Sequence, residues 1–409
     1  MNVADLKPLS FDARISDYHG QAENLFNAYK AGDPEIIQWI KERPHFWFKD
    51  YSDMVDPAEH QQSTAAFKME AAQSIIARWY AFADWPVLAE YVDAVTDKNS
   101  PVWQFESAVE AIITGDATTL RRLLEANPEL VRIHSMRKHR ATLLIYVGAN
   151  GVEYYRQKTP QNAVEIAKIL LDADSDIDAI GEMYGGTTTL GLIATSVHPY
   201  LAGVQNDLID LLLDRGASFD VAVAPDYTKG FLVNACLANG RPEAAEHLAK
   251  RGAPLNLVSA AGVGRLDIVR SYFNEHGNLN RNATREEMER AFISACNCGR
   301  MDVASFLLDR GVDISASDGQ TGLHLAVHAG KLDMVKFLIE RNAPLEIKNE
   351  YGGTVLGQAL WSAYNDPRPD HLAIIDTLLA AGAEVGDNQK WIDELRRRHA
   401  EKRNINEER

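Results

Sequence analysis

Residues 319–345 read GQTGLHLAVHAGKLDMVKFLIERNAPL, and this stretch decides the fold. It predicts a short apolar helix, a turn at Gly330, and a second helix whose apolar side chains recur every three to four residues. Arg341-Asn342 follows the second helix, and asparagine tolerates the left-handed backbone conformation that ends many helices. One pair of such short helices cannot bury its apolar face alone, so neighbouring pairs must stack on it.

The same pattern recurs along the chain. Residues 291–314, AFISACNCGRMDVASFLLDRGVDI, repeat it directly before the first stretch. Further copies are NACLANGRPEAAEHLAKRGAPL, SAAGVGRLDIVRSYFNEHGNL, TLLIYVGANGV continued by AVEIAKILLDADSDID, LIDLLLDRGASFD and IIDTLLAAGAEV. Self-similarity at this spacing predicts a solenoid with one continuous core.

The best-preserved copy carries a family resemblance. Thr321-Gly322-Leu323-His324, followed by Ala326 and Gly330, resembles the T-P-L-H-x-A…G signature of ankyrin repeats, with Gly322 in the usual proline position. The resemblance is strong over residues 229–385 and moderate over 105–220. It implies an all-α ankyrin-repeat solenoid of stacked helix-turn-helix-loop units that binds other proteins. It also implies that His324 is structural, bonding within its own turn and to the neighbouring loop.

Three regions are predicted. Residues 1–98 form a helical N-terminal region with one repeat-like helix pair, residues 99–385 the repeat solenoid, and residues 386–409 a charged capping helix. The N-terminal region resembles segments that precede repeats in bacterial ankyrin-type proteins, which implies a bacterial source. In it, residues 22–44 resemble 105–128, and residues 69–92 predict a helix broken near Asp84-Trp85-Pro86.

The predicted capping helix spans residues 389–403. Asp387 or Asn388 can cap its N-terminus. Trp391 and Leu395, one turn apart, are expected to cover the last repeat, and Arg396 to Arg398 to form a solvated face.

The charge excludes some classes of partner. The formal net charge is −16, which would repel a nucleic-acid backbone. The sequence has neither an apolar run of about 18 residues nor a secretion signal, so we expect no membrane span and a cytoplasmic location.

No metal or cofactor is predicted. Cys236, Cys296 and Cys298 lack partners at metal-ligand spacing. The acidic stretch 172–178 resembles a calcium loop but lacks its glycine and its final glutamate. It aligns better with a helix stop that places Asp174 in the glycine position.

Departures from the repeat pattern point to candidate binding loops. Residues 240–264 are too short to hold a loop finger, the hairpin-like connection between successive helix pairs. Insertions separate the two helices of three other units, at residues 151–162, 196–205 and 362–371. Insertions in a solenoid usually lie on one face, often the binding face.

Two fingers share an uncommon sequence, YGGTTTLG at residues 184–191 and YGGTVLG at residues 351–357. Both are predicted to lead into the first helix of a unit. Gly191 and Gly357 then replace the histidine that His324 represents, and both units carry an insertion.

Basic and aromatic residues concentrate between His134 and Gln205, where they are compatible with an anionic ligand, with acid–base chemistry, or with polar loops of no special role. The exposed aromatic residues of the fingers and first helices are candidate anchors for a protein partner. The predicted contact residues from both groups are Arg140, Tyr155, Arg156, Lys158, Tyr184, His198, Tyr351 and Trp361.

Two functions remain open. The first is a non-enzymatic module that binds a protein partner along the concave face and the loop fingers. The alternative is a small-molecule binding protein or an enzyme that uses the inserted loops of residues 134–205 and takes a small anionic ligand there. No nucleophile elbow, phosphate-binding loop, HExxH or dinucleotide fingerprint is present.

Overall fold

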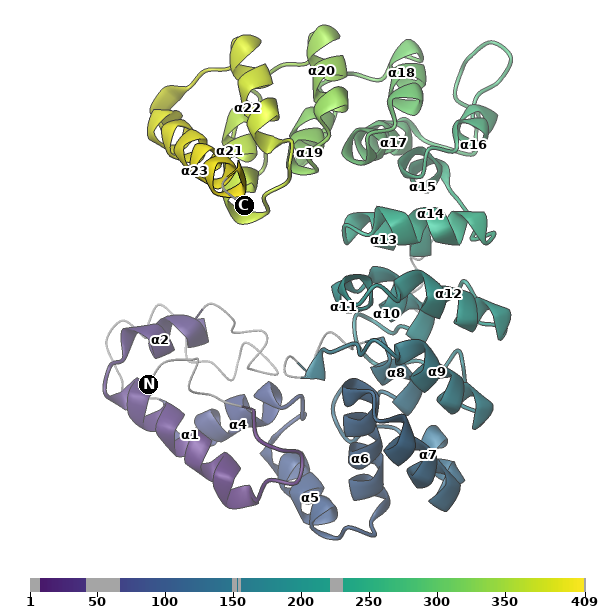
Figure 1. The fold of residues 1–409 in the computed structure, drawn as a ribbon, viewed down its shortest axis with the longest axis vertical. Helices are drawn as coiled ribbons and strands as arrows, with labels where there is room; N and C mark the ends of the chain where they lie inside the picture. Colours follow the sequence, from purple (N-terminus) through teal and green to yellow (C-terminus); the bar gives the residue numbers. More distant parts are fainter. Residues whose placement is uncertain (1–7, 42–66, 149–152, 154–155, 221–230, 408–409) are drawn as a thin grey trace. The chain divides into compact units, whose positions relative to one another are not determined.

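A computed structural model describes residues 8–41, 67–148, 153, 156–220 and 231–407. The chain forms two compact units, unit 1 (residues 1–227) and unit 2 (residues 228–409) (Figure 1). The boundaries predicted near residues 98 and 385 stay predictions. None of the helices within the described ranges is long and apolar enough to cross a membrane.

Unit 1 begins with a helical region that has its own core. Tyr18, Leu25, Ile75 and Leu88 are fully buried in it, and the rings of Tyr18 and Tyr80 meet edge to face at 4.9 Å. As predicted, the helix over residues 69–92 breaks, because Asp84 caps a new helix by accepting a hydrogen bond from Val87 N. The helices of this region are α1 (Ile15–Lys30), α2 (Pro34–Lys41), α4 (Met69–Trp79) and α5 (Trp85–Thr96).

The rest of unit 1 is a stack of helix pairs. First helices pack on first helices, α6 on α8 and α8 on α10, while second helices pack as α7 on α9 and α9 on α12. The inserted segment 196–205 contains an additional short helix, α11. These elements are α6 (Pro101–Thr114), α7 (Ala117–Ala126), the 3₁₀ helix η4 (Pro128–Arg132), α8 (Leu143–Tyr146), α9 (Ala163–Asp172), α10 (Thr189–Thr195), α11 (Val197–Leu201) and α12 (Gln205–Asp214).

Unit 2 continues the same arrangement. The second helices α18, α20 and α22 form a row beside the first helices α17, α19 and α21 (Figure 1). Residues 251–256 connect α14 directly to α15, so the predicted absence of a finger there is confirmed. The helices are α13 (Phe231–Ala238), α14 (Pro242–Lys250), α15 (Leu257–Gly262), α16 (Leu266–Ser271), α17 (Arg285–Cys298), α18 (Met301–Asp309), α19 (Gly322–His328), α20 (Leu332–Glu340), α21 (Val355–Asn365) and α22 (His371–Ala380).

Strand structure in the described residues is minimal. β1 (Ser317–Asp318) pairs antiparallel with β2 (Gln320–Thr321) in the finger before α19. The fold is therefore all-α, as predicted.

The predicted helix stops are confirmed. Four of the described units end their second helix with a glycine of positive φ: Gly216, Gly252, Gly311 and Gly382. Asn342 and Asp174 occupy the same position in their units and adopt φ of 62° and 64°. A non-glycine side chain is sterically disfavoured in this conformation. Asparagine and aspartate tolerate the conformation best.

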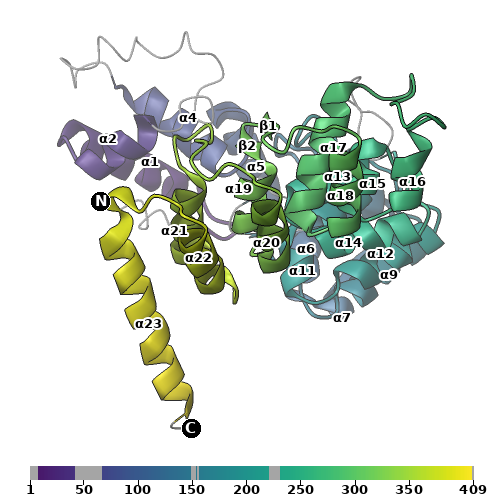
Figure 2. The ribbon, with the colours of Figure 1, turned by 90° about the horizontal axis from the view of Figure 1, so that it is seen from above.

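A long helix, α23 (Gln389–Glu407), follows the 3₁₀ helix η6 (Gly386–Asn388) and lies against α21 (Figure 2). The prediction that Trp391 and Leu395 cover the last repeat is partly wrong. Ile392 is the fully buried residue, while Trp391 is 52% exposed and meets the ring of Tyr364 of α21 edge to face at 4.8 Å. The row of α23 side chains that packs against the last repeat is centred on Ile392, the residue after Trp391.

Candidate binding surfaces

Two arginines of the basic region predicted in unit 1, Arg137 and Arg156, are buried. The guanidinium of Arg156 is buried and contacts Glu106 Oε2 at 2.6 Å, Glu110 Oε1 at 2.8 Å and Glu153 Oε2 at 3.3 Å. Arg137 is also buried, with Nε 3.2 Å from Glu153 Oε2 and Nη1 bonded to Glu106. We call these five residues the buried charge cluster.

Two neutral groups complete the hydrogen bonding of Glu153. His139 Nδ1 accepts from Ala141 N, so Nε2 carries the proton and donates to Glu153 Oε1 at 2.7 Å. The hydroxyl of Tyr146 donates to the same oxygen at 2.6 Å. Burial would raise the pKa of Glu153, but Arg137, Arg156 and His139 together hold that pKa well below its usual range. Glu153 is therefore a carboxylate at neutral pH.

The structure thus corrects the role predicted for Arg156. Its charge is neutralised by glutamates from α6 and from the inserted loop, and its side chain does not reach the surface. Arg156 connects the described part of the inserted loop, Glu153 and residues 156–162, to α6 of the repeat before it.

The other predicted residues of unit 1 do not form one site. Arg140 and Lys158 are exposed, and Tyr184 is 63% exposed in its finger. His198 Nε2 lies 3.0 Å from Gln157 Oε1, so the insertions of these two neighbouring units are in contact. Tyr155 lies outside the described residues.

An aromatic surface crosses the first helices of unit 2. Trp361 of α21 is 55% exposed, and its ring centroid lies 6.2 Å from that of His328 on α19. Tyr364, three residues further along α21 and therefore on the same helix face, meets Trp391 of α23 at 4.8 Å. We call His328, Trp361, Tyr364 and Trp391 the aromatic row.

Hydrogen bonds connect this row to the neighbouring finger. Asn349 Oδ1 accepts from the backbone N–H groups of Tyr351 and Gly353, and its amide donates to Gln358 Oε1 at 3.1 Å. Gln358 in turn donates to Ser362 Oγ, which lies 3.1 Å from His328 Nδ1. This chain fixes the finger that presents Tyr351, which at 79% is the most exposed of the large hydrophobic side chains in the described residues.

Burial lowers the pKa of His328, so the imidazole is neutral and its Nδ1 accepts the Ser362 hydroxyl proton. The donors of this chain therefore all point toward His328: Asn349 donates to Gln358, Gln358 to Ser362, and Ser362 to His328. A chain of satisfied polar groups keeps a surface rigid, which lowers the ordering entropy that a partner must overcome.

The predicted role of His324 is confirmed. Its Nδ1 lies 2.8 Å from Thr321 Oγ1, and its Nε2 lies 3.3 Å from the carbonyl oxygen of Gly353 in the next finger. The buried imidazole thus connects consecutive units.

The two YGGT copies have the predicted register. Thr188 and Thr354 cap α10 and α21 by accepting hydrogen bonds from Gly191 N and Gly357 N. A Cβ at Gly357 would meet only Thr354 Oγ1, at 3.6 Å, so the site has room. The chain after α22 runs to η6 and α23 without another finger, and a histidine at this position would lack the carbonyl partner that His324 has.

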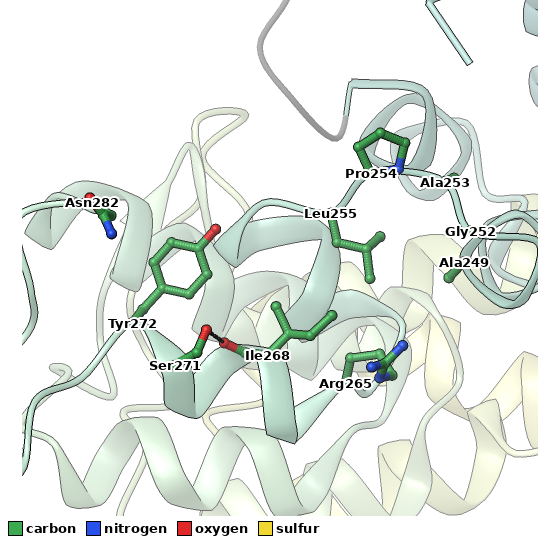
Figure 3. A pocket seen from close by; sticks show the side chains of 10 residues that line it. All are labelled: Ala249, Gly252, Ala253, Pro254, Leu255, Arg265, Ile268, Ser271, Tyr272 and Asn282. Carbon is green, nitrogen blue, oxygen red and sulfur yellow. Dashed lines mark hydrogen bonds between the residues drawn. The ribbon is translucent and has the colours of Figure 1, made fainter. Parts of the chain in front are cut away.

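A surface hollow lies beside the short connection between α14 and α15. Its volume is about 570 Å³. Pro254 and Leu255 lie on one side of it, and α16 lies on the other side (Figure 3). Ile268 and Leu255 supply its apolar part, and Arg265 at its edge is already paired with Asp267 at 2.6 Å. The hollow therefore has a mixed polar and apolar lining, and the one charged side chain among its described lining residues is already paired.

The comparisons with known proteins agree with the repeat pattern. The family model of ankyrin repeats (3 copies) matches residues 257–349 and 314–389. Residues 257–389 of this chain are therefore ankyrin repeats. The crystal structure of the human ASB11 ankyrin repeat domain is similar, with 17% identity, a TM-score of 0.35, and coverage of 68% of this chain and 98% of that domain. No curated protein matches this chain. Ankyrin repeats in general act as protein–protein interaction modules.

Proposed function

We propose that this chain is a non-enzymatic binding module whose protein partner docks on the aromatic row and the Tyr351 finger of unit 2. The observation that supports this most is the exposure of Trp361 and Tyr351 on elements joined by one hydrogen-bond chain. Tryptophan and tyrosine dominate binding energies because they bury large areas with few rotatable bonds. The partner is expected to present apolar side chains to this row.

The alternative function loses its main support. A small-molecule site or an active site in residues 134–205 was attractive because positive charge appeared to concentrate there. Arg137 and Arg156 are buried in ion pairs, and His139 is buried against Glu153. Protein binding through unit 2 is therefore the function that we favour.

We further propose a reducing compartment such as the cytoplasm. All three cysteines are free thiols, and burial raises the pKa of Cys236 to about 12 and of Cys298 to about 11. Such thiols are inert, and nothing about them calls for an oxidising environment.

Capture from lysate of the source cells tests the proposal. A specific partner retained by the wild type should be lost from the variant Trp361→Ala/Tyr351→Ala, with affinity weaker by about 30-fold or more. Both side chains are largely exposed, so helix content by circular dichroism should stay unchanged.

The matched control is Met301→Ala, which removes an exposed apolar side chain from the N-terminus of α18 and should leave capture intact. Equal retention of the partner by the folded double variant would refute this location of the binding surface.

A further inference from the structure

A cavity of about 210 Å³ lies where the last repeat meets the capping helix α23. Its walls come from α21, α22, α23 and the inserted loop 366–370, all within unit 2. We call it the cap cavity. The residues that line it are Ala363, Tyr364, Pro367, Arg368, Pro369, His371, Leu372, Ile375, Leu395, Arg398 and His399.

The cap cavity divides into an apolar part and a basic part. Leu372, Ile375 and Leu395 form the apolar part, whereas Arg368 and Arg398 supply two guanidinium groups. No carboxylate occurs among the described side chains that line it. Such a lining is unexpected in a chain of net charge −16.

Arg368 is held in a defined position. Pro367 and Pro369 flank it and restrict the backbone of the loop. Its Nη2 bonds Asp366 Oδ2 at 2.9 Å, and its backbone N–H donates to His371 Nδ1 at 3.1 Å. The aliphatic part of its side chain lies across Gly330, where a Cβ would come within 3.0 Å of Arg368 Cδ.

Arg398 differs from its two neighbours in the basic run. Arg396 pairs with Asp376 of α22, and Arg397 pairs with Glu394 on α23 itself. Arg398 lies over the ring of Tyr364 at 5.1 Å and lines the cap cavity. Its Nε donates to Glu394 Oε1 at 2.8 Å, which leaves the two Nη groups of the guanidinium for another acceptor.

His371 supports the cavity without supplying charge. It is buried, with Nδ1 accepting from Arg368 N and Nε2 donating to the carbonyl oxygen of His328 at 3.3 Å. Both ring nitrogens are thus occupied in the neutral form. The imidazole fixes the loop that carries Arg368.

We propose that the cap cavity binds a small oxyanion, a carboxylate or a phosphate, between the guanidinium groups of Arg368 and Arg398. Guanidinium groups bind such anions through paired, charge-assisted hydrogen bonds. The apolar wall of Leu372, Ile375 and Leu395 receives the carbon part of a carboxylate ligand. The volume is below the roughly 300 Å³ at which sites for drug-sized ligands begin, so the ligand has only a few heavy atoms.

This site goes beyond the proposed function, and it does not use Trp361 or Tyr351. Failure of the anion experiment would therefore leave the proposed protein-binding surface untouched, and the reverse also holds.

Isothermal titration of the full chain with butyrate, and separately with inorganic phosphate, tests the proposal at fixed ionic strength set with sodium chloride. We expect saturable binding of at least one anion, and the anion that binds identifies the ligand class. Arg368→Ala should weaken that binding about tenfold, because it removes a charge-assisted hydrogen-bond partner.

The matched control is Arg397→Ala, which removes a neighbouring arginine that does not line the cavity and should leave affinity unchanged. Because Arg398 also contacts Tyr364, Arg398→Ala is read together with circular dichroism of α23. Absence of saturable binding for both anions, or equal affinity of wild type and Arg368→Ala, would overturn the proposal.

Discussion

The two units bury different kinds of polar group inside similar helix stacks. Unit 1 encloses full charges, with Arg137 and Arg156 against Glu106 and Glu153. Unit 2 encloses neutral imidazoles, since burial lowers the pKa of His324, His328 and His371. A buried charge must have an opposite charge beside it, whereas a buried neutral histidine needs only hydrogen-bond partners. The two units should therefore respond differently to mutation and to pH.

The units also differ in net charge. Unit 1 has 19 basic and 33 acidic residues, a formal net charge of −14, whereas unit 2 has 23 and 25, a net charge of −2. Two of the basic residues of unit 1 are also buried in ion pairs. An anionic ligand is therefore disfavoured by the field of unit 1 and better tolerated by unit 2, where the cap cavity lies.

The largest effect is expected from breaking the buried charge cluster. Arg156→Ala leaves the buried carboxylates of Glu106 and Glu153 without one of their two arginine partners. Unit 1 should therefore lose about 3–5 kcal/mol in its free energy of unfolding. Urea denaturation measures this loss. The exposed neighbour Lys158→Ala should change stability by no more than about 0.5 kcal/mol. A loss below about 1 kcal/mol for Arg156→Ala would show that the cluster does not stabilise the unit.

The second effect is a difference in acid sensitivity. The buried His324 and His371 and the half-buried His328 of unit 2 have folded pKa values below their ordinary value of 6.5. The unfolded chain then binds more protons, so their contribution to stability is complete above about pH 6.5 and is lost as pH falls through the folded values. Glu153 also has a lowered pKa, and its contribution to stability is present above about pH 4.5 and is lost only below that pH.

Hydrogen exchange followed by mass spectrometry can measure both units in one chain. Between pH 7.5 and 5.5, after correction for intrinsic exchange rates, peptides from α19 to α22 should lose protection, while those from α6 and α8 keep theirs. Equal loss in both units would contradict the contrast between neutral and charged interiors.

A third effect concerns the link between consecutive units. His324→Ala removes hydrogen bonds to Thr321 and to the Gly353 carbonyl, and should destabilise unit 2 by about 1–3 kcal/mol. Thermal unfolding checks this. The reverse change, Gly357→His, should bring no comparable gain because no finger follows α22. An equal gain there would show that the histidine acts within its own turn alone.

The smallest effect is expected at a helix stop. Asp174→Gly relieves a non-glycine residue at φ 64° but removes the exposed ion pair with Arg132, so we expect a gain of about 0.5–1 kcal/mol. The mirror variant Gly216→Asp, at φ 95°, should cost a similar amount. Chemical denaturation measures the free energy of unfolding of both variants. A Gly216→Asp variant more stable than the wild type would contradict the explanation that positive φ disfavours a non-glycine residue.

Local features were predictable because they depend on nearby residues. The repeat pattern, the helix stop at Asp174 and the bond of His324 to Thr321 depend on residues within a few positions of one another. The bond of His324 to the Gly353 carbonyl spans 29 positions and was expected only from the family resemblance. The position of the covering residue on α23 was predictable only to within one residue, because Trp391 and Ile392 both suit an apolar stripe. Local spacing thus determines the helix but leaves its rotation against the repeat open.

The candidate sites were less predictable. Arg156 looks like a surface cation in the sequence, yet its partner Glu106 lies 50 positions earlier. Arg398 looks like its neighbours Arg396 and Arg397, yet it alone of the three lines the cap cavity. The first residues of the insertion predicted at 362–371 belong to α21, which ends at Asn365, and its role in binding stays a prediction. The two arginines of the cap cavity come from separate elements, the loop 366–370 and α23.

The sequence by itself determined the helical repeats, their stops and their stacking, because short-range periodicity and backbone preference set them. The tertiary structure decided which charges are buried and which are available. A charge is buried only where partners distant in the sequence compensate for the hydration that it loses, and no local pattern identifies those partners.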